Sequence, residues 1–433
     1  MPATISPIKF MRKCRMHRFL YNLLIYVTLP FVPLKLLWRG LKQPDYLKHW
    51  GERFGFYAAP LKHTKPVICL HCVSVGETRA AQPLVKALLA TFPEHTILLT
   101  HATPTGRETG EQLFGDAVQR VYLPYDAPFA VKRFIAHTSP AIVLLMETEI
   151  WFNLIAECKK NAVPCLLINA RLSEKSAAGY AKLGKLVHDG LQDLSTIGAQ
   201  TQQDAARLNT LGAENIATLG NLKFDVAVPK DTAEAGQVLR QLFGQDAFIF
   251  VAASTRDGEE EILLNALADC HIPNLVTVIV PRHPQRFNEV ENLLKTRGLA
   301  YAKRSTLTQP IVTSYILGDS MGELFSYYAA CDVAFVGGSL LPFGGQNLIE
   351  PCALGKPVLI GAHTFNFELA AATASKIGAA IQVESAGVLV EKLAELAATP
   401  ALRQKMSEAG LTFVAENQGA TEKTVALIRQ YLD

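Results

Sequence analysis

The sequence of 433 residues lacks the short motifs that mark several common enzyme classes. No GxGxxG follows its first expected strand and no GxxxxGKS/T occurs, which argues against NAD-type dinucleotide sites and P-loops. HExxH and GxSxG are absent as well, so neither a zinc protease nor a nucleophile-elbow hydrolase is indicated. No convincing cluster of metal ligands stands out. We therefore predict no metal site and no bound cofactor.

Charged residues are also scarce, at 19% of the chain, and they leave a net charge of only +3. So small a surplus on this length does not suggest a nucleic-acid partner. Hydrophobic residues make up 49%, which is enough to form sizeable cores. The length exceeds what one core can organise, and it predicts two domains of roughly 150–200 residues each.

The eight cysteines are scattered, and most lie in apolar runs. They are Cys14, Cys69, Cys72, Cys158, Cys165, Cys270, Cys331 and Cys352. Cys69 and Cys72 form a CxxC within VICLHCV, a run typical of a strand. Residues three apart on a strand point to opposite faces, and no second pair completes a zinc site. We interpret these cysteines as reduced core thiols, which favours a cytosolic location for the body of the protein.

Residues 19–34 (FLYNLLIYVTLPFVPL) form a strongly apolar segment between two groups of basic residues. The basic residues are Lys9, Arg12, Lys13, Arg15 and Arg18 before it, and Lys35, Arg39 and Lys42 after it. No small-residue cleavage site of a secretory signal is evident. The segment is short for a span of about 20 residues, so it is either a short membrane-spanning anchor or a helix lying in the membrane interface. A buried N-terminal helix is the third interpretation.

From about residue 65 the chain alternates short apolar runs with helical patterns, which include expected helices at 79–90, 322–330 and 347–354. A less regular stretch, 221–235, has the pattern of a linker, and the alternation then restarts with AFIFVAAST and LVTVIVPRH. Strands that alternate with helices predict parallel, doubly wound sheets. Two such halves predict two Rossmann-like domains facing across a cleft, lined by loops at the carboxyl ends of the strands.

Two strand-to-helix junctions in the front half carry acidic residues. In the first, Gly76 permits a close approach of the backbone, and Glu77 lies near a helix N-terminus. There Glu77 is either a general base or a favourable partner of the helix dipole. In the second, Glu147 and Glu149 follow the apolar run AIVLL, where two acids are costly unless they are hydrogen-bonded or face a site. N-capping of the next helix explains one of them but not both.

Three junctions in the rear half suit an anionic ligand. Arg282 stands at a strand end, where its guanidinium matches phosphate or carboxylate oxygens, and His283 beside it is either a donor or a structural residue. Residues 318–324 place paired glycines before a helix and offer backbone N–H groups. Residues 336–351 contain four glycines and end in a helix that carries Glu350, a carboxylate able to hold a ribose.

Over nearly its whole length the sequence resembles the 3-deoxy-D-manno-oct-2-ulosonic acid (Kdo) transferases of lipopolysaccharide synthesis. The strings that carry this resemblance are HCVSVGETRAA, YLPYD, METEIW, NARLSEKSAAGYAKLGK, NLKFD, VPRHPQRF, MGELF, AFVGGSL and ENQGA. Each string is weak alone, but together and in this order they are a strong signal. The resemblance implies a GT-B glycosyltransferase fold. Its parts are a membrane anchor or interfacial segment (1–45), an acceptor-binding domain (46–225), a CMP-Kdo-binding domain (226–415) and a C-terminal helix (416–433).

The activity that the resemblance implies is transfer of Kdo from CMP-Kdo to a lipid A precursor (lipid IVA). The reaction inverts the anomeric carbon, needs no metal, and takes place at the cytoplasmic side of the inner membrane, whose lipids are a further partner. Glu77 matches the general base of the family, and Glu147 and Lys223 match positions that stabilise the transition state. The predicted substrate-binding residues are Ser74, Gly76, Pro281, Arg282, Met321, Gly322, Glu323, Asn347, Leu348, Ile349 and Glu350.

Three positions depart from the family pattern. Gln346 and Arg256 stand where members often have His, and Phe152 stands where they have Pro. None of these changes removes the predicted base. The alternatives are a GT-B transferase that uses another nucleotide sugar, or a non-catalytic lipid- or nucleotide-binding protein on the same scaffold.

Overall fold

The computed structural model describes residues 17–57 and 65–433, and the chain divides into two compact units. Unit 1 comprises Met1–Asp225 and Gln418–Asp433, and unit 2 comprises Val226–Asn417. Part of the predicted N-terminal segment lies outside the described residues. These parts are Lys9, Arg12, Lys13, Arg15 and Cys14.

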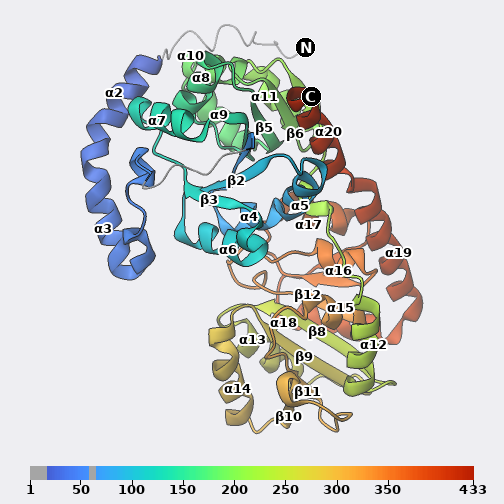
Figure 1. Ribbon diagram of the computed structural model, residues 1–433. Coiled ribbons are helices and arrows are strands. Elements are labelled where there is room, and N and C mark those ends of the chain that lie inside the picture. The colour runs from blue at the N-terminus through green and yellow to red at the C-terminus, as the bar shows by residue number, and fades with distance from the viewer. Residues whose placement is uncertain (1–16, 58–64) are drawn as a thin grey trace. The chain divides into compact units, whose positions relative to one another are not determined.

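Unit 1 is built on a seven-stranded parallel sheet in the order β3-β2-β1-β4-β5-β6-β7, with helices packed against it (Figure 1). Its central strands are apolar throughout because both faces of the sheet are covered. The strands are β1 (Val67–His71), β2 (Thr96–His101), β3 (Gln119–Tyr122), β4 (Pro140–Met146), β5 (Cys165–Ala170), β6 (Thr196–Ala199) and β7 (Ile216–Thr218). Cys69 and Cys72 are buried in two different core clusters of unit 1, as expected for opposite faces of one sheet.

Several helices of unit 1 begin at a hydroxyl side chain that accepts a backbone N–H of the first turn. Ser74, Thr103 and Thr201 are such caps. The helices are α2 (Arg18–Thr28), α3 (Val32–Lys42), α4 (Val75–Ala80), α5 (Gln82–Thr91), α6 (Pro104–Phe114), α7 (Pro128–Thr138), α8 (Phe152–Lys160), α9 (Glu174–Ala181), α10 (Lys185–Gln192), α11 (Gln202–Thr210) and α20 (Ala420–Leu432). The last helix belongs to unit 1 because its apolar face completes the core beside α5, and its start is fixed by Asp225, which accepts the Gly419 N–H at 2.7 Å.

Unit 2 repeats the architecture with a second seven-stranded parallel sheet, in the order β10-β11-β9-β8-β12-β13-β14. The strands are β8 (Phe248–Thr255), β9 (Leu275–Pro281), β10 (Tyr301–Lys303), β11 (Tyr315–Leu317), β12 (Val333–Val336), β13 (Val358–Ile360) and β14 (Ala380–Gln382). The helices are α12 (Thr232–Phe243), α13 (Glu259–Leu267), α14 (Phe287–Thr296), α15 (Leu324–Ala330), α16 (Ile349–Ala353), α17 (Glu368–Lys376), α18 (Ala386–Ala398) and α19 (Pro400–Asn417). Two parallel α/β sheets confirm that part of the predicted fold.

Each sheet has one position where the order of strands along the chain reverses. It lies between β1 and β4 in unit 1, and between β8 and β12 in unit 2. In open parallel sheets the loops at the carboxyl ends of these two strands diverge to opposite faces and leave a crevice where ligands bind. The fold therefore directs attention to the loops after β1 and β4, and to the loops after β8 and β12.

Several predicted element boundaries were wrong. The helix expected over 79–90 is two helices, because Pro83 in the first turn of α5 begins a new helix after Ala81. The expected linker is partly ordered, since Leu222–Phe224 forms a 3-10 turn (η5) and α12 already begins at Thr232. The helix expected from residue 322 begins at Leu324, because Gly322 has φ +83°, and the helix expected from residue 347 begins at Ile349.

Candidate active site

Glu77 lies in the first turn of α4, just beyond the carboxyl end of β1. Ser74 caps this helix, and its Oγ accepts the Glu77 N–H at 3.5 Å. The Glu77 carboxylate turns back toward the start of the helix, where its Oε2 accepts the Val73 N–H at 2.5 Å. Gly76, the exposed residue before it, adds no side chain that would cover the site. The cap thus fixes this carboxylate at the β1 end of the crevice in unit 1.

The Glu77 carboxyl group is partly withdrawn from water, and this burial raises its pKa from the ordinary value of 4.5 to about 7. The hydrogen bond from Val73 lowers the pKa of Glu77, whereas the nearby carboxylates of Glu147 and Glu149 raise it and Arg171 lowers it. A carboxyl group with a pKa near 7 is partly ionised at neutral pH and is still basic enough to take a proton from a reacting hydroxyl.

Glu147 lies directly after β4, on the other side of the crevice in unit 1. Its backbone is in the left-handed region with φ +55°, which costs about 1–2 kcal/mol for a residue with a side chain. Its N–H still donates to the carbonyl of Ile168 at 3.0 Å. Glu147 is 6% exposed, and its carboxylate is held between two cations. Arg171 Nε donates to its Oε2 at 2.9 Å, and Lys223 Nζ lies 4.0 Å from its Oε1.

Lys223 reaches this cluster from η5, the short turn just before the end of the first segment of unit 1. The buried side chains of Leu222 and Phe224 anchor the turn, and Asn169 Oδ1 accepts the Leu222 N–H at 3.1 Å. Desolvation lowers the pKa of Lys223, while the carboxylates of Glu147 and Glu77 raise it. The three predicted catalytic residues therefore form one electrostatic cluster in unit 1.

Glu149 is the second acid of the METEIW string, and it is hydrogen-bonded rather than the cap of the next helix. Both acids lie between the end of β4 at Met146 and the start of α8 at Phe152. The N-cap residue of α8 is Trp151, whose side chain does not cap the helix; the Asp126 carboxylate accepts the Asn153 and Leu154 N–H groups of its first turn, each at 2.9 Å. Instead, Glu149 Oε2 accepts the Trp151 indole N–H at 2.8 Å. Burial, together with the charge of Glu147, raises the pKa of Glu149.

In unit 2 the glycine-rich loop after β12 is held by a buried carboxylate at the start of α13. Glu259 is 0% exposed, and its Oε2 accepts the Gly338 N–H at 2.6 Å and the Arg256 N–H at 2.9 Å. Its Oε1 accepts the N–H groups of Ser339 and Leu340, each at 3.0 Å. Burial raises the pKa of Glu259, and these hydrogen bonds oppose the rise. Three amides of the loop are thus used within the protein.

The structure brings Arg282 and Glu350 together at the carboxyl end of the sheet in unit 2. The Arg282 N–H donates to the carbonyl of Thr255 at 3.0 Å, and Glu350 Oε1 accepts from Asn347 Nδ2 at 3.1 Å. Burial is the largest cause of the raised pKa of the Tyr328 phenol. The charge of Glu350 raises this pKa further and the charge of Arg282 lowers it, so both side chains lie near the phenol. A cation and a carboxylate able to bind a ribose therefore lie near one another.

The other predicted binding residues of unit 2 differ in what they can offer to a ligand. Leu348 and Ile349 are buried, so only their backbone can contact one. Met321 is exposed just before α15, whereas the Glu323 carboxylate already pairs with Arg304 at 2.7 Å. Pro281 ends β9 within the core of the sheet.

The loop after β9 is fixed by a buried ion pair that the sequence did not suggest. Arg286 donates to both carboxylate oxygens of Glu260, at 2.6 and 3.0 Å, and it also pairs with Asp257 and Glu289. Thr255 Oγ1 donates to the same Glu260 carboxylate at 2.6 Å. These contacts connect the start of α13 to the 282–286 loop and so position both.

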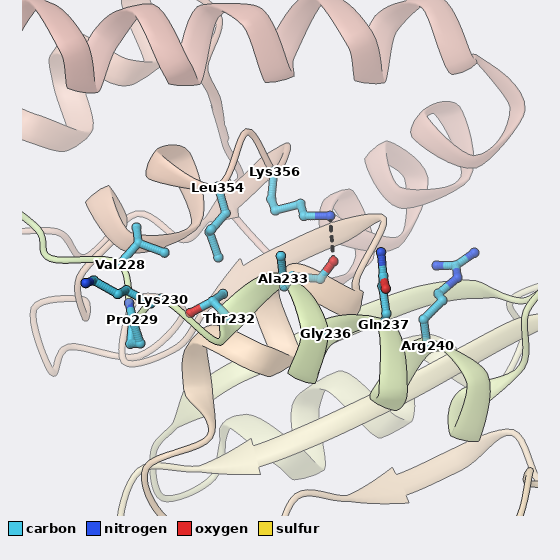
Figure 2. A pocket seen from close by; sticks show the side chains of 11 residues that line it. Val228, Pro229, Lys230, Thr232, Ala233, Gly236, Gln237, Arg240, Leu354 and Lys356 are labelled. Carbon is cyan, nitrogen blue, oxygen red and sulfur yellow. Dashed lines mark hydrogen bonds between the residues drawn. The ribbon is translucent and has the colours of Figure 1, made fainter.

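A cavity of about 470 Å³ in unit 2 lies elsewhere, along α12 (Figure 2). Three cations line it, and two of them are engaged by the protein: Lys356 Nζ donates to the carbonyls of Ala329 and Cys331, each at 2.9 Å, and Arg240 pairs with Asp332 at 2.7 Å. None of the predicted site residues lines this cavity. Lys356 and Arg240 thus stabilise the fold, and the cavity is a poor candidate for the reaction site.

Comparison with known proteins gives one consistent answer. The family model for 3-deoxy-D-manno-octulosonic-acid transferase (kdotransferase) matches residues 48–226. The 3-deoxy-D-manno-octulosonic acid transferase of Bordetella pertussis is 41% identical, over 96% of this chain and 100% of the relative. That of Haemophilus influenzae is 38% identical, over 96% and 99%. This chain belongs to the Kdo transferase family. It is therefore an enzyme, a glycosyltransferase of lipopolysaccharide biosynthesis.

Solved structures agree with this Kdo transferase at the level of the fold. A glycosyltransferase from Rickettsia africae superposes with a TM-score of 0.57 at 16% identity, covering 86% of this chain and 100% of that one. Identity this low shows only the two-sheet architecture of the GT-B type, so the function of each residue must come from the local chemistry.

Two side chains that shape the candidate sites of this Kdo transferase were not found by the sequence reasoning. Arg171 directly follows β5 inside the NARLSE string, and the argument that selected Arg282, an arginine at a strand end, would have selected it too. Glu259 stands in a run of three acids after Gly258, a pattern more often explained by the helix dipole. Only the fold shows that its carboxylate is buried beneath the glycine-rich loop.

Proposed function

We propose that this enzyme transfers Kdo from CMP-Kdo to a lipid A precursor with inversion at the anomeric carbon, and that Glu77 is the general base. The observation that carries the proposal is the Glu77 carboxyl group itself. It is fixed at the β1–β4 crevice with a pKa of about 7, next to a second carboxylate that is neutralised by Arg171 and Lys223.

The chemistry needs one proton acceptor and one leaving group. The acceptor hydroxyl oxygen attacks the anomeric carbon of Kdo and forms the new glycosidic bond. Its proton passes to the Glu77 carboxylate, and the bond from the anomeric carbon to the phosphate oxygen breaks with its electron pair, which releases CMP. A single displacement of this kind inverts configuration and uses no covalent enzyme intermediate.

The cations of the unit 1 cluster are placed to stabilise the negative charge that develops in this step. Lys223 and Arg171 lie on either side of Glu147. Together with Glu77 these residues form a cluster of two carboxylates and two cations, and its net charge is close to zero. A preorganised cation beside the Kdo carboxylate or the departing phosphate lowers the barrier because it needs no reorganisation during the reaction. Glu147 holds that cation in place.

Unit 2 is proposed to bind the CMP part of the donor. Arg282 suits the phosphate and Glu350 suits the ribose hydroxyls, and the two lie near one another around Tyr328. Asn347 orients the Glu350 carboxylate through its Nδ2 donor. The proposal requires the donor held by unit 2 to meet Glu77 of unit 1 during turnover, as in the GT-B arrangement predicted from the sequence.

A lipid acceptor requires contact with a membrane, and α2 and α3 suit this role. The stretch Arg18–Lys42 is long and apolar enough to cross a membrane, by length and composition alone. Its large apolar side chains are turned outward: Phe19 is 80% and Leu41 84% exposed. Such a surface, with basic residues at its ends, is typical of helices that lie in the headgroup region of a bilayer.

Contacts on the inner side of α2 favour the interfacial geometry over a membrane span. Tyr21 donates its hydroxyl to the buried carboxylate of Asp126 at 2.9 Å, and Asn22 Oδ1 accepts from Asn153 Nδ2 at 2.7 Å. Arg18 pairs with Asp193 at 3.0 Å. A spanning helix would lose all three contacts and leave Asp126 without its phenol donor. We propose that α2 and α3 lie flat on the cytoplasmic face of the inner membrane.

The experiment is incubation of the purified enzyme with CMP-Kdo and tetra-acylated lipid A precursor, followed by mass spectrometry of the lipid. The expected product is heavier by one or more Kdo residues, with and without a metal chelator. Glu77→Gln keeps an acceptor for the Val73 N–H and should lose transfer, whereas Glu174→Gln, at an 88% exposed side chain, should retain it. Transfer from UDP- or ADP-sugars but not from CMP-Kdo would support another glycosyltransferase and contradict the proposal.

A further inference from the structure

Arg256 is the first residue after β8, so it stands at the position where the strand order of unit 2 reverses. The neighbouring strand at that position is β12, and the two strand ends touch. A side chain at Gly337 would meet the carbonyl oxygen of Ser254 at 2.7 Å. The crevice of unit 2 is therefore formed by the 256–258 turn on one side and the glycine-rich loop on the other.

The side chain of Arg256 lies along that loop. Its Cγ packs beside Gly338, and its guanidinium carbon lies 4.7 Å from the centroid of the Phe343 ring. A guanidinium over an aromatic face is held in place and keeps its planar N–H groups free at the edges. Gln346 Nε2 also borders Gly338, so both polar side chains converge on one glycine.

The charge of Arg256 is not neutralised by the protein. Within residues 17–57 and 65–433 no carboxylate forms an ion pair with its guanidinium, and its Nε is buried without a hydrogen-bond partner. The neighbouring Arg286 is different, because Glu260, Asp257 and Glu289 surround it. A buried donor without a partner destabilises the protein, and a hydrogen bond to a ligand oxygen would offset that cost.

The usual alternative for holding a phosphate at this position is blocked. In many nucleotide sites the backbone N–H groups of a glycine-rich loop bind the phosphate oxygens. Here the N–H groups of Gly338, Ser339 and Leu340 donate to Glu259. An anion at the β8–β12 crevice must therefore rely on side-chain donors, and Arg256 and Arg282 both lie close enough to His283 to lower its pKa after the larger effect of burial.

We propose that Arg256 binds the phosphate of the donor nucleotide at the β8–β12 crevice, a role that rests on the proposed use of CMP-Kdo. The ring of Phe343 holds the guanidinium in place. Glu259 fixes the loop that carries this ring, because its carboxylate accepts the loop N–H groups that would otherwise bind the anion. Arginine at this position gives a charge that does not titrate in the physiological range, so donor binding should depend little on the ionisation of this residue.

The test is calorimetric titration of full-length enzyme with CMP and with cytidine. Arg256→Gln should weaken CMP binding by about 10- to 100-fold and leave cytidine binding nearly unchanged, because a charge-assisted hydrogen bond to phosphate is lost. Arg256→Lys should recover part of the affinity. The matched control is Arg297→Gln, which removes the same charge from a partly buried position of unit 2 where Arg297 pairs with Glu261.

A titratable replacement separates a phosphate contact from a merely structural role. For Arg256→His, the ratio of its Kd for CMP to that of the wild type should rise as pH increases through about 6.5, where imidazole loses its charge. The ratio cancels the ionisation of the phosphate itself.

Three outcomes decide the matter. Wild-type CMP affinity in Arg256→Gln would overturn the inference, and so would an equal loss for CMP and cytidine, which indicates a displaced loop. If the wild type does not bind CMP at all, the proposed function itself fails, and that result is distinguishable from either of the others.

Discussion

The raised pKa of Glu77 makes a quantitative prediction for the pH dependence of transfer. With a pKa of about 7, roughly one tenth of the carboxyl groups are ionised at about pH 6 and roughly nine tenths at about pH 8. If the ionised form is the base, kcat/KM should rise about tenfold between these two pH values. With the ordinary pKa of 4.5, the same group would be almost fully ionised at both, and the rate would be nearly flat.

Two substitutions should shift the rising limb of this pH–rate profile in opposite directions. The carboxylate of Glu149 raises the pKa of Glu77, so Glu149→Gln should lower that pKa and shift the limb to lower pH. Arg171 lowers the pKa of Glu77, so Arg171→Gln should shift the limb to higher pH. The glutamine at position 149 can still accept the Trp151 indole N–H, which limits other damage.

The assay is the initial rate of Kdo transfer at donor and acceptor concentrations well below KM, followed by lipid extraction and mass spectrometry at several pH values. Ionisation of the substrates would give a limb that is the same in all three proteins. A flat profile between about pH 6 and 8, or a limb that neither substitution moves, would refute the assignment of the limb to Glu77.

Three further predictions concern the supporting residues. Lys223→Met should lower kcat by about 10²–10³-fold because a cation beside the reacting charges is lost, while CMP affinity measured by calorimetry stays close to that of the wild type; a large loss of CMP affinity with unchanged kcat would contradict this. Glu259→Gln should lower the free energy of unfolding by about 1–3 kcal/mol in a denaturant titration, since a single amide oxygen cannot accept all the N–H groups that the carboxylate accepts. Leu24→Glu should weaken sedimentation with anionic lipid vesicles, whereas the matched Leu411→Glu, at a comparably exposed leucine of α19, should not; equal behaviour of the two variants would argue against α2 as the membrane contact.

The sequence was most informative where its pattern is set by burial. The apolar runs of both sheets were found because a parallel strand covered on both faces must be hydrophobic along its length, as in Ile142 through Met146. Helix starts were less predictable, since Pro83 begins a second helix inside one apolar pattern and Gly322 delays another. Local composition does not indicate at which of two adjacent positions a helix will begin.

Side-chain partners were the part that sequence could not supply. Glu147 and Lys223 are 76 positions apart in the chain, and the packing of η5 against Asn169 brings them together. The Glu259 carboxylate is likewise distant in sequence from the glycine-rich loop it binds. The resemblance to a family selected the predicted catalytic residues, and the fold then showed the contacts that hold them and the burial that raises the pKa of Glu77.

The most direct measurement is to determine CMP affinity and the rate of Kdo transfer on one preparation of Glu77→Gln beside the wild type. If Glu77 is the base of this transferase, the variant should bind CMP as tightly as the wild type and transfer Kdo about 10²–10⁴-fold more slowly. Transfer within a few-fold of the wild-type rate would contradict that assignment, whatever the affinity for CMP.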